Sequence, residues 1–358
     1  MEQKKSLIIL GIDTSCDDTC IAILKVKNFD ILSNIVSSQV KLHKKYGGVW
    51  PYLAKREHQK NLPIVFKEAL QQARSKQKFE KPNLIAVTVG PGLEPCLWTG
   101  VNFAKELAQK LNLPIIPVNH IEAHILSNFV NKKLQTINYK IKTNLFPALC
   151  LVVSGGHTQL ILMKKVGKYK IIGETRDDAA GECFDKTARI LGLGYPGGPA
   201  IEAEAAKLKT KNYQLITNLP RPMIRQKNYD FSFSGLKTAV LYDFKNKPRN
   251  VRTSKKYKIE MAKEIQQAVI DVLIKKTIKA AKDFNARSII LGGGVTANQE
   301  LRKQFNYKLK TINYKLNLLV PSKNLCTDNA SMVTMSGYFN RKKATTFENI
   351  SVNANLKI

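Results

Sequence analysis

Two histidines spaced four residues apart are the first candidates for chemistry in this chain. His120 and His124 belong to the segment HIEAH, which follows the apolar run PIIPV and precedes further apolar residues, so it predicts a helix. On a helix, that spacing places both imidazoles on one face, as two ligands of one metal require. Two ordinary polar helix residues are the alternative, but the whole chain has only five histidines. The pair therefore indicates a metal site.

The glutamate in the same segment argues against a zinc peptidase. Peptidases of that class carry a glutamate directly after the first histidine, where it flanks the metal and activates water. Glu122 stands two residues after His120, which turns it about 200° around a helix. A hydrolytic zinc site is therefore disfavoured.

Two histidines need a third ligand, and Asp328 in the segment LCTDNAS is the best candidate. It stands at a predicted helix start, so a plain N-cap is its alternative role. An oxygen ligand beside two imidazoles leaves coordination positions open, which suits Fe(II), with Zn(II) as the alternative. The expected cofactor is one Fe(II) ion per subunit, held by His120, His124 and Asp328.

Two acidic clusters are further candidates. Asp17 and Asp18 crowd one turn with Asp13, and a second cluster lies in DDAAGECFDK, residues 177–186. Solvated turn carboxylates are the ordinary interpretation of such clusters. Neighbouring carboxylates also raise one another's pKa, and they can act as bases or hold a cation. Each cluster stands near a polar or glycine-rich turn, which favours the chemical interpretation.

Glycine-rich turns offer places for an anion. Ser154-Gly155-Gly156 has no Cβ to obstruct its last two residues, so backbone N–H groups can approach a phosphate closely. A second run, Gly292-Gly293-Gly294, precedes a helix predicted to start near Thr296, and a helix N-terminus favours phosphate. The chain contains neither a dinucleotide fingerprint in its usual place nor a P-loop.

The elements that must position these residues occur twice. LIILGIDTSCDDTCIAILKV and ALCLVVSGGHTQLILM each predict a β-hairpin, and each half continues with a strand, a glycine loop and a helix. This pattern predicts a duplicated α/β unit with loops converging between two lobes. We expect an N-terminal lobe at residues 1–130, to which 330–358 return. A basic connecting segment is expected at 131–146 and a C-terminal lobe at 147–329.

Composition narrows the functional classes. The chain has 358 residues, with 58 Lys and Arg against 27 Asp and Glu, which gives a formal charge of +31. Such a chain attracts polyanions, although a genome rich in A and T also yields lysine-rich proteins. No apolar run approaches the roughly 18 residues of a membrane span. Six scattered cysteines fit neither a disulfide scaffold nor a zinc motif, so we expect a cytoplasmic protein.

Nine segments follow one another in the chain: LGIDTSCDDT, YGGVWPYLAKREHQ, GPGL, HIEAH, LVVSGGHTQL, DDAAGECFDKTARILGLGYPGGP, DFSFSGLKT, GGGVTANQELR and CTDNASM. They resemble, in order, the signature blocks of the TsaD family of tRNA threonylcarbamoyladenosine-forming transferases. That family has the fold of actin, Hsp70 and sugar kinases: an α/β fold of two lobes built on duplicated RNase H-like units, with the active site in the interlobe cleft. The resemblance implies transfer of a threonylcarbamoyl group from threonylcarbamoyl-AMP to N6 of adenosine 37 in tRNAs that read codons beginning with A, with release of AMP.

The resemblance also implies roles for individual residues. His120, His124 and Asp328 match the family's metal ligands, for which iron is the usual ion. Asp17 and Asp18 match an acidic pair, and we expect one of them to accept or orient a proton. The expected partners are tRNA, a paralogous dimerisation partner and an ATPase helper protein. The positions that match adenylate contacts are Val152, Val153, Ser154, Gly155, Gly156, Asp185, Gly198, Glu202 and Asn298.

The chain departs from the family pattern at several positions. Tyr52 replaces a usual glutamate, Glu94-Pro95 replaces Val-Gly, Asp18 stands where glutamate is common, and the usual Arg-Trp tail is missing. Two other functions remain open. An ATP-dependent phosphotransferase would share the fold without needing two histidine ligands, and a non-catalytic scaffold paralogue would be expected to have lost them.

Overall fold

The computed structural model describes residues 1–358 except 1–5, 28, 77–80, 131–144, 209–217 and 313. The chain forms two compact units. Unit 1 combines Met1–His43, Val49–Asn144 and Pro321–Ile358, and unit 2 combines Lys44–Gly48 with Leu145–Val320. Residues 131–144 of the predicted connecting segment lie outside the described residues, and residues 321–329 group with unit 1 in this division.

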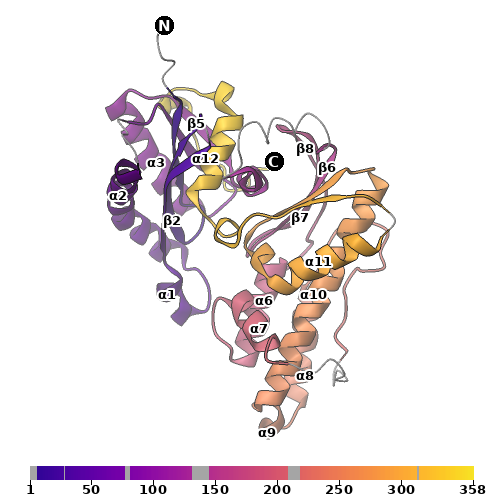
Figure 1. The fold of residues 1–358 in the computed structure, drawn as a ribbon. Coiled ribbons are helices and arrows are strands. Elements are labelled where there is room, and N and C mark those ends of the chain that lie inside the picture. Colours follow the sequence, from indigo (N-terminus) through magenta and orange to yellow (C-terminus); the bar gives the residue numbers. More distant parts are fainter. Residues whose placement is uncertain (1–5, 28, 77–80, 131–144, 209–217, 313) are drawn as a thin grey trace. The chain divides into compact units, whose positions relative to one another are not determined.

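Unit 1 is built on a mixed five-stranded sheet (Figure 1). Its strands lie in the order β3-β2-β1-β4-β5; the first three are antiparallel, and β4 and β5 run parallel to β1. The connections explain this arrangement, because a short turn joins an antiparallel pair whereas parallel strands need a crossover. The strands are β1 (Ile8–Asp13), β2 (Asp18–Lys25), β3 (Asp30–Ser38), β4 (Leu84–Gly90) and β5 (Ile115–Asn119).

Alternating residues of β1 face different helices. Leu10 and Ile12 pack in the cluster that includes α2 (Pro51–Lys76) and α3 (Glu94–Leu111). Ile9 packs instead with α12 (Ala330–Phe339), which covers the other face of the sheet. Gly11 allows α12 to lie close, since a Cβ there would sit 2.6 Å from the Ala330 carbonyl oxygen. The two-residue period of the strand thus gives the sheet two covered faces.

Unit 2 repeats the strand order of unit 1. Its sheet has the order β8-β7-β6-β9-β10, with β6, β7 and β8 antiparallel and with β9 and β10 continuing parallel to β6. Each strand of unit 1 thus has a counterpart in unit 2, which confirms the predicted duplication of an RNase H-like unit. The strands are β6 (Ala148–Val153), β7 (Thr158–Lys165), β8 (Lys168–Glu174), β9 (Ser288–Gly292) and β10 (Asn317–Leu319).

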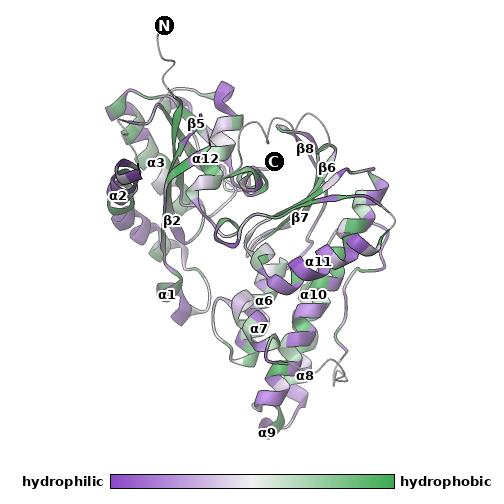
Figure 2. Cartoon of the chain, viewed as in Figure 1, coloured by the Kyte–Doolittle hydropathy of each residue, from purple (hydrophilic) through white to green (hydrophobic). Residues whose placement is uncertain are grey.

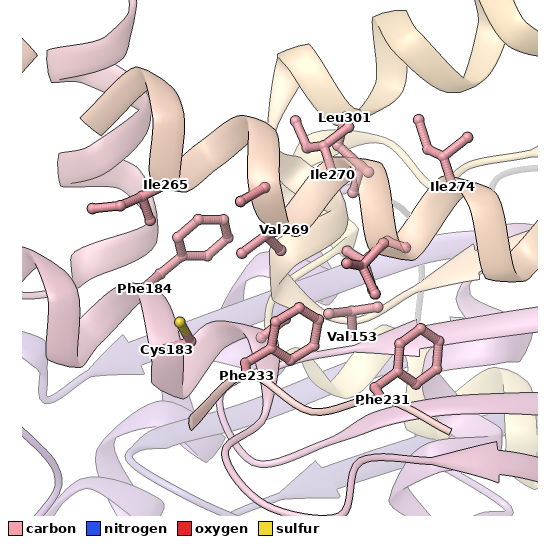
Figure 3. Close-up of a cluster of buried hydrophobic side chains, with 14 of the residues drawn as sticks. Val153, Cys183, Phe184, Phe231, Phe233, Ile265, Val269, Ile270, Ile274 and Leu301 are labelled. Carbon is pink, nitrogen blue, oxygen red and sulfur yellow. The ribbon is translucent and has the colours of Figure 1, made fainter. Parts of the chain in front are cut away.

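A large apolar core fixes the strands and helices of unit 2 (Figure 3). Val153, at the end of β6, packs with Phe184 and Val269, which belong to α6 and α10. Green apolar stretches mark the strands in Figure 2, while α10 (Lys255–Asp283) carries both green and purple residues and α11 (Gln299–Thr311) is mostly purple. This agrees with burial, which is extensive along α10 and restricted to Leu301 and Phe305 in α11. The helices are α6 (Ala180–Leu191), α7 (Gly197–Ala205), α8 (Ser234–Asn246), α10 (Lys255–Asp283) and α11 (Gln299–Thr311).

Among the described residues, the remaining α-helices are short: α1 (Val40–His43), α4 (His120–Leu126) and α9 (Arg249–Arg252). The helix expected near Thr296 begins later, at Gln299, because residues Gly294–Ala297 form a short 3-10 turn before it. None of the described helices is both long and apolar enough to cross a membrane.

Candidate functional site

The two histidines of HIEAH lie on a short helix whose start is fixed by its own sequence. Strand β5 ends at Asn119, and the Asn119 side chain accepts hydrogen bonds from the backbone N–H groups of Ile121 and Glu122 at 2.9 and 3.1 Å. This N-cap begins α4 at His120. His120 and His124 are both buried. Their Nε2 atoms lie 3.1 Å apart, as the four-residue spacing predicts.

Asp328 reaches the same point from the segment before α12. The cap of α12 is the neighbouring Asn329, whose side chain accepts a hydrogen bond from the Met332 N–H group. Asp328 is therefore not used as a cap. Its Oδ1 lies 3.2 Å from His124 Nε2 and 3.5 Å from His120 Nε2. All three residues belong to unit 1.

The three donor atoms have the mutual spacing of ligands around one ion. Ligands about 2.1 Å from a metal and separated by 90–109° would lie roughly 3.0 to 3.4 Å apart. The observed separations are 3.1, 3.2 and 3.5 Å. Two imidazoles and one carboxylate form the donor set of open-sided Fe(II) centres and also of zinc centres. His120, His124 and Asp328 thus fit a metal site in both geometry and chemistry.

Asp13 lies behind the first histidine and was not among the expected site residues. It ends β1, and its Oδ2 is 3.5 Å from His120 Nδ1, the ring nitrogen that faces away from the cluster. A carboxylate in that position orients a metal-bound imidazole and selects its tautomer. One indication of this role was present in the sequence, since Asp13 belongs to the first acidic cluster. The residues around Asp13 do not predict that it lies next to α4.

The charges of the cluster control one another's protonation. Burial opposes a charge on His120, but Asp328 and Asp13 outweigh it and raise the pKa of His120 to about 10. Burial and the neighbouring His120 charge both lower the pKa of His124. The pKa of Asp328 is lowered despite its burial, because both imidazoles lie against it. Without a metal, a proton on His120 therefore balances the two carboxylates, and a divalent cation would displace that proton.

Glu122 has a structural role in the described structure. Its Oε2 accepts hydrogen bonds from Ser336 Oγ at 3.1 Å and from Asn340 Nδ2 at 2.7 Å, and all three residues are buried. These contacts join α4 to α12, which follows the segment that carries Asp328. The Glu122 carboxylate thus binds Ser336 and Asn340, which agrees with the expectation, from its position two residues after His120, that Glu122 does not activate water as in a zinc peptidase.

Asp17 ends the turn between β1 and β2, and Asp18 is the first residue of β2; both belong to the same unit as the candidate metal ligands. Burial, followed by the Asp328 charge, raises the pKa of both carboxyl groups, and that of Asp18 rises to about 7. A carboxyl group with that pKa can accept a proton and release it near neutral pH.

The Ser154-Gly155-Gly156 turn joins β6 to β7 in unit 2. The Ser154 N–H donates to the His157 carbonyl oxygen at 2.8 Å, which closes the turn. Gly155 and Gly156 are exposed, and a Cβ at either position would meet no other atom within 4 Å. Gly181 of α6 packs tightly beneath them, since its N–H donates to the Ser154 carbonyl at 3.2 Å. The turn therefore offers open backbone on a fixed support.

Four of the other expected adenylate positions lie at the start of a helix or bind the start of one. Asp185 Oδ1 accepts from the Gly197 N–H at 2.6 Å, beside Gly198 at the start of α7. Glu202 Oε1 accepts from the Gln299 N–H at 2.6 Å, and Asn298 caps α11. Val152 and Val153, at the end of β6, are fully buried. The sequence missed these capping roles, because they join segments far apart in the chain.

The second acidic cluster does not bring its carboxylates together as a cation site. Asp177 accepts hydrogen bonds from the hydroxyl groups of Ser232 and Ser234. Lysines and hydroxyl groups thus already bind these carboxylates in the described structure, and a role of the cluster as a base stays a prediction. The ion pairs are Lys186–Asp178 at 2.8 Å, Lys186–Glu182 at 2.7 Å and Lys237–Asp178 at 3.0 Å.

The two sheets of the same strand order, a duplicated RNase H-like unit, place the chain in the actin-like fold class. The cluster of two histidines and one carboxylate adds a candidate metal centre to that fold. Comparison with known families specifies the class further. Residues 30–335 match the model of the TsaD family, tRNA N6-adenosine threonylcarbamoyltransferase, and the chain belongs to that family. It is therefore a threonylcarbamoyltransferase that acts in tRNA modification.

Curated relatives agree over nearly the whole chain. The tRNA N6-adenosine threonylcarbamoyltransferase of Thermosipho africanus is 46% identical over 358 residues, which cover 98% of this chain and 100% of the relative. The enzyme of the same name from Geobacillus kaustophilus is 43% identical over 358 residues, 99% of this chain and 97% of that one. Both similarities span the segments that carry the candidate site.

Solved structures of more distant proteins share the fold. HypF of T. kodakarensis superposes with a TM-score of 0.58 at 14% identity, over 95% of this chain and 48% of that one. The activator of 2-hydroxyisocaproyl-CoA dehydratase from Clostridium difficile gives 0.50 at 13% identity, over 98% of this chain and all of that one. At such identities these similarities support the fold alone.

Proposed function

We propose that the chain transfers the threonylcarbamoyl group of threonylcarbamoyl-AMP to N6 of adenosine 37 in tRNAs that read codons beginning with A. We also propose that His120, His124 and Asp328 hold one Fe(II) ion per subunit, with Zn(II) as the alternative. The observation that carries the metal assignment is the convergence of three donor atoms within 3.1–3.5 Å. When bound, such an ion supplies Lewis-acid polarisation and a template for orientation.

The chemistry requires positioning more than covalent help from the protein. An exocyclic adenine amine is a weak nucleophile because its lone pair is delocalised into the ring. A mixed carbamic-phosphoric anhydride already carries a good leaving group. The residues of the chain must therefore hold amine and carbonyl in attack geometry and accept the proton that the amine loses.

Residues of unit 2 fit the adenylate half of the donor. The Gly155 and Gly156 N–H groups, with open space around them, would bind its phosphate. Asp185, Gly198, Glu202 and Asn298 would contact the nucleoside. In unit 1, Asp18, and Asp17 as its neighbour, would accept the amine proton, since burial raises the pKa of Asp18 to about 7.

The partner proteins are proposed from the family resemblance. We propose that a paralogous dimerisation partner and an ATPase helper act with the chain, as the family resemblance implies. All six cysteines are free, which supports action in the reducing cytoplasm.

The test combines metal analysis with product analysis. The wild-type chain, His120→Ala, His124→Ala and Asp328→Asn would each be given threonylcarbamoyl-AMP, unmodified tRNA and the partner proteins. Nucleosides would be quantified by mass spectrometry, and bound iron and zinc by elemental analysis. Glu122→Gln is the matched control, because it changes the same helix but keeps an oxygen to accept the Ser336 and Asn340 hydrogen bonds.

We expect the three ligand variants to lose both metal and product, and Glu122→Gln to keep both. Ligand variants that modify tRNA at the wild-type rate would refute the metal role. A phosphorylated product and ADP in a parallel reaction supplied with ATP, with no modified nucleoside in the main reaction, would favour the phosphotransferase alternative. A wild-type chain that forms no product with all components present would favour the scaffold alternative.

A further inference from the structure

An exposed aromatic surface lies at the beginning of α2 in unit 1. Trp50, directly before the helix, is 54% exposed, and Tyr52, its second residue, is 72% exposed. Leu42 of α1 is 41% exposed. Large aromatic side chains are usually mostly buried, and exposed ones are enriched where another molecule binds. We call Leu42, Trp50 and Tyr52 the aromatic surface.

Cations accompany the aromatic surface. From residue 31 to residue 56 the sequence has no Asp or Glu, but it has five basic residues. Three of these, Lys41, Lys55 and Arg56, belong to unit 1, and Lys41 and Arg56 are exposed. A surface that combines aromatic rings with cations fits a single-stranded nucleic acid, whose bases stack on the rings and whose phosphates bind the cations.

Buried hydrogen bonds fix this surface to the acidic turn. The Trp50 N–H donates to His43 Nδ1 at 3.3 Å, so the proton of this neutral ring lies on Nε2, which donates to Gln39 Oε1 at 3.1 Å. The Gln39 N–H in turn donates to the Asp17 carbonyl oxygen at 3.1 Å. His43 and Gln39 are both buried. Trp50 is thus linked to Asp17 through two residues.

A second connection runs from the interior of α2. His58, also buried, donates from Nε2 to the Cys16 carbonyl oxygen at 3.0 Å and accepts from Thr19 Oγ1 at 2.8 Å on Nδ1. Both partners belong to the segment that contains Asp17 and Asp18. The helix that carries Tyr52 is therefore held against the acidic turn, and a molecule bound on the aromatic surface is held in register with that turn.

We propose that unpaired nucleotides of the tRNA anticodon loop stack on Trp50 and Tyr52, while Lys41 and Arg56 bind the adjacent phosphates. The inference rests on the proposed function only in taking tRNA as the substrate. Lys41, Lys55 and Arg56 outnumber the one carboxylate next to this stretch, Glu57, and the exposed apolar groups are mainly aromatic, which favours RNA over a protein partner. The family pattern has a glutamate at the position of Tyr52, and the carboxylate of that glutamate would repel a phosphate. Tyr52 places an aromatic ring there instead.

Binding can be measured on the full-length chain without donor or metal. The chain has two tryptophans, Trp50 and Trp98, so Trp98→Phe leaves Trp50 as the only indole. An anticodon stem–loop oligonucleotide should quench its fluorescence. The double variant Trp50→Ala with Tyr52→Ala should bind the stem–loop about 5- to 150-fold more weakly for each base that loses its stacking partner.

Two further variants separate stacking from loss of side-chain bulk. Trp50→Phe with Tyr52→Phe keeps both rings and should restore most of the affinity. The matched control is Tyr242→Ala with Tyr307→Ala, which removes two rings that are 61% and 69% exposed in unit 2. This control should bind the stem–loop like the wild type.

The proposal is overturned if the double alanine variant binds the stem–loop as tightly as the wild type, or if Trp50 fluorescence does not respond. It is also overturned if the double alanine variant changes the sedimentation coefficient of the chain but not RNA binding, since the surface would then be a protein contact. Failure of the transfer assay with intact RNA binding would instead contradict the proposed function.

Discussion

The raised pKa of Asp18 makes the stability of the metal-free chain depend on pH in a defined direction. Burial, then the Asp328 charge, raises its pKa from 3.8 to about 7. Between these values the folded state keeps a proton that the unfolded state has lost. Stability falls with increasing pH wherever the folded state binds more protons. Asp18 therefore destabilises the fold progressively as pH rises from about 4 to 7, and Asp18→Asn should remove that contribution.

The magnitude follows from the shift. The difference of about 3 pKa units, at 1.36 kcal/mol per unit, corresponds to at most about 4 kcal/mol. Urea unfolding in the presence of a chelator, at several pH values between 4 and 8, would measure it. The free energy of unfolding of the wild type should fall by up to about 4 kcal/mol relative to that of Asp18→Asn across this range.

The comparison isolates Asp18 because His120, which also has a raised pKa, is present in both chains. Asp30→Asn, which removes an exposed carboxylate at the start of β3, controls for the loss of a charge in the same unit. Parallel curves for the wild type and Asp18→Asn would refute the reasoning, and would also remove the physical support for Asp18 as the proton acceptor.

Three other substitutions test the remaining contacts. Asp13→Asn should weaken metal affinity by about 10- to 100-fold, measured by competition with a chelating dye, while unchanged affinity would show that the carboxylate does not orient His120. Glu122→Ala should lower the free energy of unfolding by about 3 kcal/mol, because two buried donors lose a charged acceptor; a loss below about 1 kcal/mol in urea unfolding would contradict this. Gly181→Ala should weaken AMP binding in calorimetry, because its Cβ would sit 2.4 Å from the Ser154 carbonyl oxygen, whereas Gly235→Ala, whose nearest contact is 3.8 Å, should bind AMP normally.

Local patterns were sufficient to predict most of the fold. The hairpins follow from apolar alternation around short polar turns, and their recurrence in order predicted the duplicated sheet. The helix at His120 was also predictable from a local pattern, because HIEAH follows an apolar strand-like run and precedes further apolar residues. The spacing of the two histidines then restricted them to one face, and their mutual distance needed no tertiary information.

Contacts between distant segments could not be read in this way. Asp13 meets His120 only because a parallel crossover brings the ends of β1 and β5 to one edge of the sheet. Asp178 looked like a member of an acidic cluster, but Lys237, 59 residues further along the chain, neutralises it. Neither pairing can be inferred from spacing along the sequence. The lysine partner of Asp178 and the contact between Asp13 and His120 were therefore not predicted.

Unit 1 is assembled from segments on both sides of unit 2, and this affects the order in which its metal ligands become available during synthesis. His120 and His124 leave the ribosome early, but Asp328 follows only after all of unit 2 has been made. A chain that stops anywhere before residue 328 carries two ligands and no third, however well its first sheet has formed. A metal that needs all three ligands could therefore bind only after translation has passed residue 328.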